Sequence, residues 1–283
     1  MIRKSFFAPV VLSFLFFLLW TLHAASAGVL EDVMSKGELA VSTSPVYAPQ
    51  SFLNDKGKFV GFDIDVAKEV AKRLGVTVKF VTPSWDWIVA GKWRAHWDLS
   101  IGSMTITEER AIVLNFSIPY YHTPAQFALH ETNKTISTLS DFTGKTIGVG
   151  MNTTYESYLD PNKTLSIGDG EKIFWQVEGA KVKKYVIELE MLQDLAFGDG
   201  VRLDGILTSG YVIADAINKG LPLKRFGNPV FYEPLAAACD KDRTGSKEFI
   251  KRISTIFESM HEDGTLTDFS MKWYGVDISK RVR

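Results

Sequence analysis

The residues with the most evident chemistry lie between Ser100 and Tyr121, in the segment SIGSMTITEERAIVLNFSIPYY. The pattern predicts a buried strand, a polar turn and a short helix that carries Arg110. Because Arg110 closely follows Thr105 and Thr107, two hydroxyl groups and a guanidinium can converge on one small anion. A guanidinium presents a rigid fork of N–H donors that fits a carboxylate through two parallel hydrogen bonds. The segment therefore indicates a carboxylate-binding site, against the alternative that Arg110 is an ordinary solvated residue.

The first part of the chain has the features of a targeting segment. Arg3 and Lys4 form a basic start, Phe6 to Leu22 is an almost continuous apolar run, and Ala25-Ser26-Ala27 follows as a small-residue cleavage signature. This pattern predicts a signal peptide over residues 1–27 that is cleaved on export. The alternative is a transmembrane anchor, since the apolar run approaches the length that spans a bilayer. We expect an exported protein, most simply one of a Gram-negative periplasm.

Composition narrows the classes of function. Cleavage would leave 256 residues with 30 basic and 33 acidic side chains, a net charge of −3. Such a balance favours neither nucleic acid nor anionic lipid as a partner. The only cysteine, Cys239, lies in the apolar run LAAAC and is expected to be a small core residue. We expect no metal and no cofactor, because metal-ligand spacing is absent from the histidines His96, His122, His130 and His261.

The hydrophobic pattern alternates between strands and helices. Glu38 to Thr43 and Val76 to Val81 read as strands, and Asp63 to Leu74 between them has apolar residues at helical spacing. A second series of the same kind begins near Pro124. This alternation predicts an α/β protein with a mostly parallel sheet, helices on both faces and two lobes.

Five motifs in series resemble a known family, the periplasmic solute-binding proteins of polar amino-acid ABC transporters (family 3 type). The motifs span the predicted mature chain and are GFDIDVAKEVAKRLG (61–75), SMTITEERAIVLNFSIPYY (103–121), DFTGKTIGVGMNTTYESYL (141–159), RLDGILTSG (202–210) and EDGTLTDFSMKWYG (262–275). Each motif alone is weak, but their order along one chain makes the resemblance specific.

The resemblance implies a two-lobed periplasmic binding protein (type II, Venus-flytrap) in which two hinge strands let the lobes close on a ligand. The first lobe would comprise residues 28–121 and 237–283, and the second residues 123–230. The hinges would lie near residues 120–122 and 232–236.

The resemblance also implies roles for individual residues. Arg110 would bind the α-carboxylate of the ligand, while Thr105 and the backbone of Ser103 face the same groups. In the second lobe Thr153 and the amides at the start of a helix would hold the other edge of the carboxylate. The aromatic positions expected to sandwich the ligand side chain are Tyr47 and Trp85, although Trp85 has the alternative of a packing role.

Two positions depart from the family pattern. The family usually carries an acid that pairs with the α-ammonium of the ligand, and Ser209 stands there; some members have a second acid where this chain has Ser44. An ammonium would then depend on neutral oxygens, from Ser103, Thr105, Ser44 and Ser209. Because an unpaired buried ammonium is costly, a modified, secondary-amine or amine-free carboxylate is an alternative ligand.

These observations favour a monomeric, non-enzymatic receptor that captures an amino acid or related small carboxylate and delivers it to the membrane permease of an ABC importer. A cyclohexadienyl dehydratase-like enzyme on the same fold is the main alternative. That chemistry needs an acid able to protonate a leaving hydroxyl, and the expected stretch, residues 209–212, contains none. A sensory protein that docks on a receptor is a third possibility.

Overall fold

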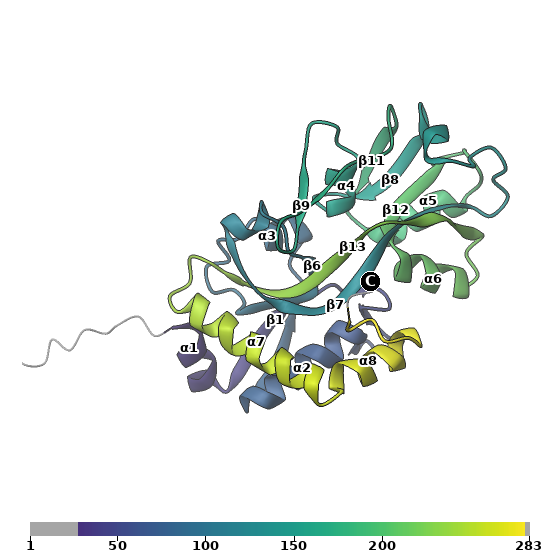
Figure 1. The fold of residues 1–283 in the computed structure, drawn as a ribbon. Coiled ribbons are helices and arrows are strands. Elements are labelled where there is room, and N and C mark those ends of the chain that lie inside the picture. The colour runs from purple at the N-terminus through teal and green to yellow at the C-terminus, as the bar shows by residue number, and fades with distance from the viewer. Residues whose placement is uncertain (1–27, 281–283) are drawn as a thin grey trace, which may run out of the picture.

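The structure is a computed structural model that describes residues 28–280, so the predicted signal peptide lies outside the described residues. A mixed eight-stranded sheet with the order β11-β8-β12-β7-β13-β6-β1-β5 runs through the molecule. Two long strands at its centre, β7 (Leu114–His130) and β13 (Leu223–Asp240), cross from one α/β lobe to the other (Figure 1).

The lower lobe in Figure 1 combines elements from both ends of the chain. Its strands are β1 (Glu38–Ser42), β2 (Val46–Tyr47), β3 (Ser51–Leu53), β4 (Phe59–Val60), β5 (Thr77–Val81) and β6 (Leu99–Thr105). Its helices are α1 (Val29–Lys36), α2 (Phe62–Leu74), α3 (Trp85–Val89), the 3-10 helix η1 (Arg110–Ile112), α7 (Ser246–Glu262) and α8 (Thr265–Tyr274). Strands β5, β1 and β6 are parallel, which brings their carboxyl ends to the edge that faces the other lobe.

The upper lobe is built from the middle of the chain. Its strands are β8 (Thr146–Gly150), β9 (Leu165–Ile167), β10 (Glu171–Ile173), β11 (Lys181–Tyr185) and β12 (Gly205–Ser209). Its helices are the 3-10 helix η2 (Leu139–Phe142), α4 (Thr154–Tyr158), α5 (Glu188–Ala196) and α6 (Gly210–Asn218). Strands β11, β8 and β12 are parallel, whereas the short β9 and β10 form an antiparallel pair.

The connection between the lobes is a two-stranded antiparallel ribbon. Strand β6 pairs with β13 from Leu235 onward, and β12 pairs with β7 from Ala125 onward. Between these points β7 and β13 pair only with each other within the sheet, and Glu233 lies opposite Thr123. The predicted hinge residues 232–236 include this stretch of β13.

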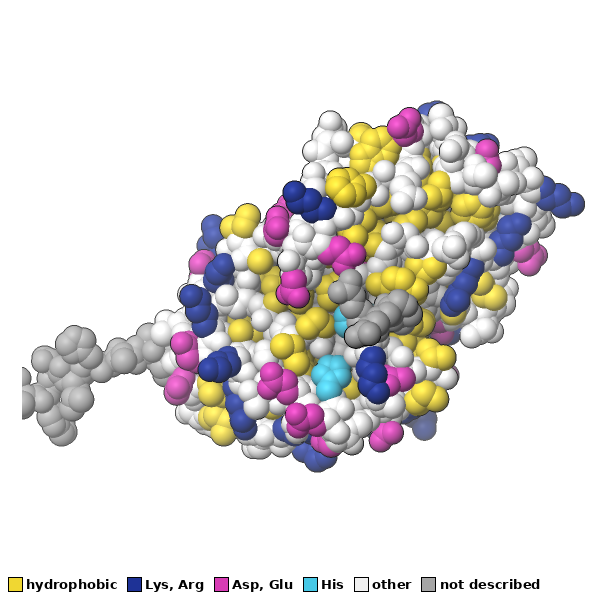
Figure 2. All heavy atoms as spheres, viewed as in Figure 1, with side chains coloured by type: hydrophobic (Ala, Val, Ile, Leu, Met, Phe, Trp, Pro, Cys, Tyr) yellow, Lys and Arg dark blue, Asp and Glu magenta, His cyan; other side chains and the backbone are white. Residues whose placement is uncertain are grey.

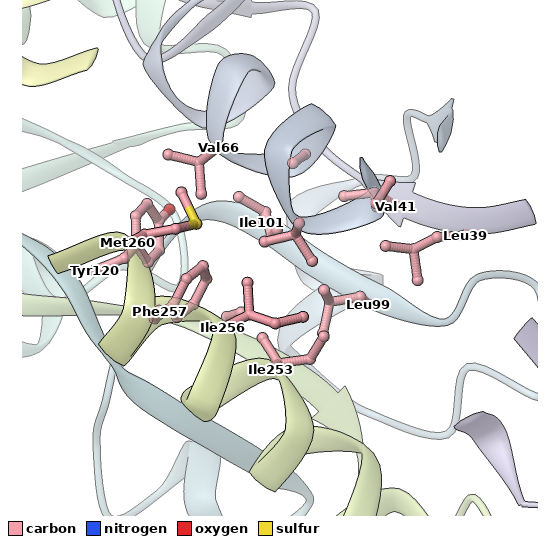
Figure 3. Packing of buried hydrophobic residues seen from close by; sticks show 14 of the residues in the cluster. Leu39, Val41, Val66, Leu99, Ile101, Tyr120, Ile253, Ile256, Phe257 and Met260 are labelled. Carbon is pink, nitrogen blue, oxygen red and sulfur yellow. The ribbon is translucent and has the colours of Figure 1, made fainter. Parts of the chain in front are cut away.

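Amphipathic helices on both faces of the sheet enclose the core of the lower lobe. Helix α2 buries apolar residues spaced three or four apart and ends at Gly75, whose φ of 77° is readily adopted by glycine. Figure 3 shows Val66 of α2, Leu99 of β6, and Ile253 and Phe257 of α7 in one cluster of buried side chains. The upper lobe has its own clusters around β8, β12 and α5, so each lobe is packed independently.

The sequence predicted the alternation of elements better than the sheet topology. The flanking strands of both lobes are parallel as expected, but β7 and β13 are antiparallel to each other and to their neighbours, so the prediction of a mostly parallel sheet is only partly right. The short helix expected to carry Arg110 is the single-turn 3-10 helix η1. Helix α1 was not predicted.

Charges of both signs are interspersed on the face of the molecule shown in Figure 2. Cys239 is buried in the core of the lower lobe, as its apolar neighbours predict. Within residues 28–280 no helix combines the length and apolarity needed to cross a bilayer.

Candidate functional site

A cavity of about 150 Å³ lies where the two lobes meet. Both lobes and both central strands contribute to its walls. The structure brings together seven of the eight side chains predicted for the site, which are Ser44, Tyr47, Trp85, Ser103, Thr105, Arg110 and Thr153.

Arg110 is the cation of this cavity and is only 8% exposed. Its Nη1 donates to the carbonyl of Thr105 (3.0 Å) and its Nη2 to the carbonyl of Asn152 (3.1 Å). Its backbone N–H donates to Thr107 Oγ1, which fixes the start of η1. The guanidinium also lies 5.1 Å from the centre of the Trp85 ring, within cation–π range. Burial lowers the pKa of Arg110 to about 10, so the side chain stays charged at neutral pH.

Asn152 joins the upper lobe to the lower one across the cavity mouth. Its carbonyl accepts hydrogen bonds from Arg110 and from the indole Nε1 of Trp85 (3.1 Å), and its side-chain amide donates to Asp86 (2.7 Å). Its φ of 57° lies in the left-handed region, which asparagine tolerates better than most residues. The structure is therefore a closed arrangement of the lobes.

Glu233 of β13 is the buried acid at the centre of the site, with 2% exposure. Three hydroxyl groups donate to its carboxylate: Thr105 from the lower lobe (2.6 Å), and Thr154 and Tyr155 (2.6 Å for Tyr155) from the upper lobe. Because an ionised carboxylate only accepts hydrogen bonds, this set of donors suits a charged Glu233. The carboxylate can also accept from a cationic ligand group.

Glu188, the first residue of α5, places a second carboxylate in the cavity lining. Its Oε1 accepts a short hydrogen bond from the hydroxyl of Thr208. Burial, with a smaller contribution from the negative charge of Glu233, raises the pKa of Glu188 to about 7 against the opposing effect of the Thr208 hydroxyl. Near neutral pH this side chain exists in both protonated and charged forms.

The remaining predicted residues have local hydrogen bonds that orient them. Ser44 Oγ accepts from the backbone of Val46 (3.3 Å), and Thr153 Oγ1 donates to the carbonyl of Gly150 (2.7 Å) at the start of α4. Ser209 is different: it is fully buried, its hydroxyl is hydrogen-bonded to that of Thr123 (2.6 Å), and it does not line the cavity. Thr123, which lies on β7 opposite Glu233, lines the cavity in place of Ser209.

A buried polar network beneath the cavity holds Ser103. Asp63 accepts from Ser103 Oγ (2.7 Å) and from the hydroxyl of Tyr120 (2.8 Å), and the hydroxyl of Tyr121 donates to Ser103 Oγ (2.6 Å). This network keeps Ser103 at a φ of 57°, in the left-handed region. Asp63 thus positions a cavity residue from the first turn of α2 without lining the cavity itself.

Sequence reasoning missed both acids of the site. Glu233 lies inside the predicted hinge, in the segment FYEPLAAAC, and an acid next to a run of small apolar residues was a usable signal. Glu188 lies three residues after the carboxyl end of β11 at Tyr185, in the region where binding residues of parallel sheets gather. The inference that the site lacks an anion was therefore wrong, because it considered only Ser44 and Ser209.

The other chemistry that could define a site is metal binding. Within residues 28–280 no group of three or more His, Cys, Asp or Glu side chains is arranged to hold a metal ion.

Comparisons with known proteins agree with this geometry. Residues 39–276 match the sequence profile of the bacterial extracellular solute-binding proteins, family 3. The L-cystine-binding protein TcyJ of Escherichia coli strain K12 is 31% identical over 257 residues, which cover 90% of each chain.

Solved structures show the same two-lobed fold. A P235GK mutant of ArgBP from T. maritima superposes with a TM-score of 0.75 at 25% identity. The ancestral amino acid-binding protein AncCDT-1, a precursor of cyclohexadienyl dehydratase, superposes with a TM-score of 0.74 at 28% identity. Both comparisons cover 87% of this chain and 99% of the other. The predicted type II periplasmic binding protein fold with two hinge strands is confirmed.

The buried Asp63 predicts a pH-dependent stability. Burial raises the pKa of Asp63 to about 7, although the hydrogen bonds from Ser103 and Tyr120 oppose the shift. An aspartate in the unfolded chain ionises near pH 4, so between about pH 4 and pH 7 the native state binds the extra proton. The free energy of unfolding of the ligand-free protein should therefore fall as pH rises through this interval. Asp63→Asn should reduce that fall, measured as the difference in Tm between about pH 5 and pH 8.

The control is Asp55→Asn, which changes an exposed acid between β3 and β4 and leaves Asp63 in place. This variant should keep the pH dependence of the wild type. Because the pKa of Glu188 is raised in the same direction, Asp63→Asn should retain part of the fall. A folded Asp63→Asn protein with an undiminished pH dependence would contradict the assignment.

Proposed function

The chain belongs to the bacterial extracellular solute-binding proteins of family 3, and from this premise we propose that it is the amino-acid receptor of an ABC importer. In this proposal the protein captures a small amino acid between its lobes and delivers it to a membrane permease. The observation that carries the proposal is the presence of one buried cation, Arg110, and one buried acid, Glu233, in a single cavity between the lobes. An α-amino acid offers the complementary pair of charges.

The proposed binding mode follows from the donors and acceptors of the cavity. The Arg110 guanidinium binds the α-carboxylate with the help of the Thr153 hydroxyl. Glu233 takes the α-ammonium in place of the acid that the family usually carries at the position of Ser209. Thr105 Oγ1, already bonded to Glu233, is placed to accept from the same ammonium. The ring of Trp85 covers one side of the ligand beside Arg110.

The proposal extends to the organisation and location of the protein. The first lobe comprises residues 28–121 and 237–283, the second residues 123–230, and bending occurs near residues 120–122 and 232–236. The protein acts as a monomer in the periplasm after loss of residues 1–27. Relatives named as periplasmic or ABC transporter-binding proteins support the periplasmic location and the partnership with an ABC transporter.

Arg110→Lys tests the carboxylate clamp. The lysine keeps the charge but loses the planar fork of donors, and a hydrogen bond to a charged group contributes roughly 1.5–3 kcal/mol. We expect the affinity to fall by at least about tenfold for whichever standard L-amino acid stabilises the wild type most in a thermal-shift screen. Isothermal titration calorimetry measures the change. The exposed Arg252→Lys on α7 is the matched control and should bind like the wild type; equal binding by Arg110→Lys would refute the clamp.

Glu233→Gln tests the ammonium site separately from closure of the lobes. The variant retains hydrogen bonding to the neighbouring hydroxyls but removes the charge. We expect the affinity for the amino acid to fall at least about tenfold, while the affinity for the matching carboxylic acid without an α-amino group changes much less. Equal losses for both ligands would show that Glu233 only stabilises the closed form.

An enzyme resembling cyclohexadienyl dehydratase is the second candidate function. The observation in its favour is Glu188, whose pKa of about 7 suits a general acid near neutral pH. However, Arg110 is the only cation among the described residues that line the cavity, so one carboxylate of prephenate would lack a charged partner. We expect purified protein to leave prephenate and arogenate unchanged. Turnover that disappears in Glu188→Gln would establish the enzyme instead.

A further inference from the structure

The charges that line the cavity do not balance. Arg110 contributes one positive charge, whereas Glu233 and Glu188 contribute two carboxyl groups. None of the three forms a salt bridge with another described residue; their partners are carbonyl and hydroxyl groups. A zwitterion with one carboxylate and one ammonium would satisfy Arg110 and Glu233 and leave the carboxyl group of Glu188 without a cation.

Charge complementarity then points to the kind of ligand. Opposite charges within a partly buried site attract far more strongly than in water, and an uncompensated buried charge is costly. We propose that Glu188 is the specificity-determining residue that binds a second cationic group, so that the ligand is a basic amino acid. This inference rests on the proposed amino-acid receptor function and names the ligand class of the same site.

The surroundings of Glu188 suit the far end of a long side chain. Its Oε1 is held by Thr208, while Oε2 has no hydrogen bond to another described residue and can accept from a ligand. Glu188 and Tyr47 line both the cavity and an adjoining groove of about 240 Å³. The groove therefore borders the cavity at the end where Glu188 lies, and this is the end that a flexible lysine- or arginine-like side chain would reach.

The order of the charged groups also matches a basic amino acid. Glu233 lies next to Arg110, because the carbonyl of Thr105 accepts from Arg110 and its hydroxyl donates to Glu233. Glu188 lies at the end of the cavity whose walls are shared with the adjoining groove. In this spatial order, Arg110 pairs with the α-carboxylate of the ligand, Glu233 with its α-ammonium and Glu188 with its side-chain cation. The alternative is that Glu188 stays protonated and serves only as a partner of Thr208.

The titratable groups around Glu188 favour charge-coupled binding. Glu233 faces it from β13, and the phenols of Tyr47 and Tyr155 face it from β2 and α4. Asp215 and Lys219 of α6 line the adjoining groove and are paired with each other (2.6 Å). Since no described residue forms a salt bridge with Glu188, a ligand cation would favour its charged form, so binding near pH 7 should release a fraction of a proton.

Arginine and citrulline provide the sharpest test, because they have nearly the same shape and differ in side-chain charge. The wild-type protein, titrated calorimetrically near pH 7 in two buffers of different ionisation enthalpy, should bind L-arginine or L-lysine at least about tenfold more tightly than L-citrulline or L-norleucine. It should also release a fraction of a proton with the basic ligands only. Affinity for the basic ligands should fall between about pH 8 and pH 5.5, as Glu188 takes up its proton.

Glu188→Gln should remove this preference and the proton release, while citrulline binding changes less than about threefold. Glu190→Gln, on the exposed face of the same helix, should behave like the wild type. Wild-type protein that binds neutral amino acids as tightly as basic ones overturns the inference but leaves the receptor function intact. Failure to bind any amino acid would overturn both the receptor function and the inference about its ligand. The comparison of ligands on the wild-type protein tests the inference even if Glu188→Gln does not fold.

Discussion

The carboxylate of Glu233 is the interaction on which the site depends. A buried carboxylate is stable only when hydrogen-bond donors or a cation replace its lost hydration. Here the donors come from both sides: Thr105 from the lower lobe, and Thr154 and Tyr155 from the upper lobe. Because Glu233 itself lies on a strand that connects the lobes, closure assembles its donors and completes the binding site in one step.

Arg110 imposes a second requirement of the same kind. Both terminal nitrogens donate to backbone carbonyls, one in each lobe, so the guanidinium is oriented by the closed arrangement. Asn152 supplies the upper-lobe carbonyl and also bonds Trp85 and Asp86, which links three lower-lobe groups to one residue. The cation and the central acid are thus fixed by contacts between lobes, and a ligand that bridges them would favour closure through differential affinity for the two states.

The sequence predicted the parts of this protein that local patterns encode. The period of α2, its terminal Gly75 and the series of family motifs identified the fold and seven residues that line the cavity, including Arg110 and Thr105. Positions that depend on long-range strand pairing were harder to predict from the sequence. The antiparallel course of β7 and β13 depends on contacts about one hundred residues apart, and only that pairing places Glu233 opposite Thr123. The start of α5 likewise has no local feature that distinguishes Glu188 from other helix-start acids such as Glu190.

The neutral Ser209 acquires a meaning once Glu233 is considered with it. An acid at position 209 would face Thr123, the direct neighbour of Glu233 across the ribbon, and two carboxylates so close repel each other. Ser209 is instead small and neutral. Its buried hydroxyl is hydrogen-bonded to that of Thr123, and Glu233 remains the central anion. An acid on one lobe can attract a ligand in the open state. Glu233 lies instead on the connecting strand, and it has its full set of hydrogen-bond donors only when the lobes meet. In the proposed binding mode, recognition of the ammonium would thereby be coupled to closure itself.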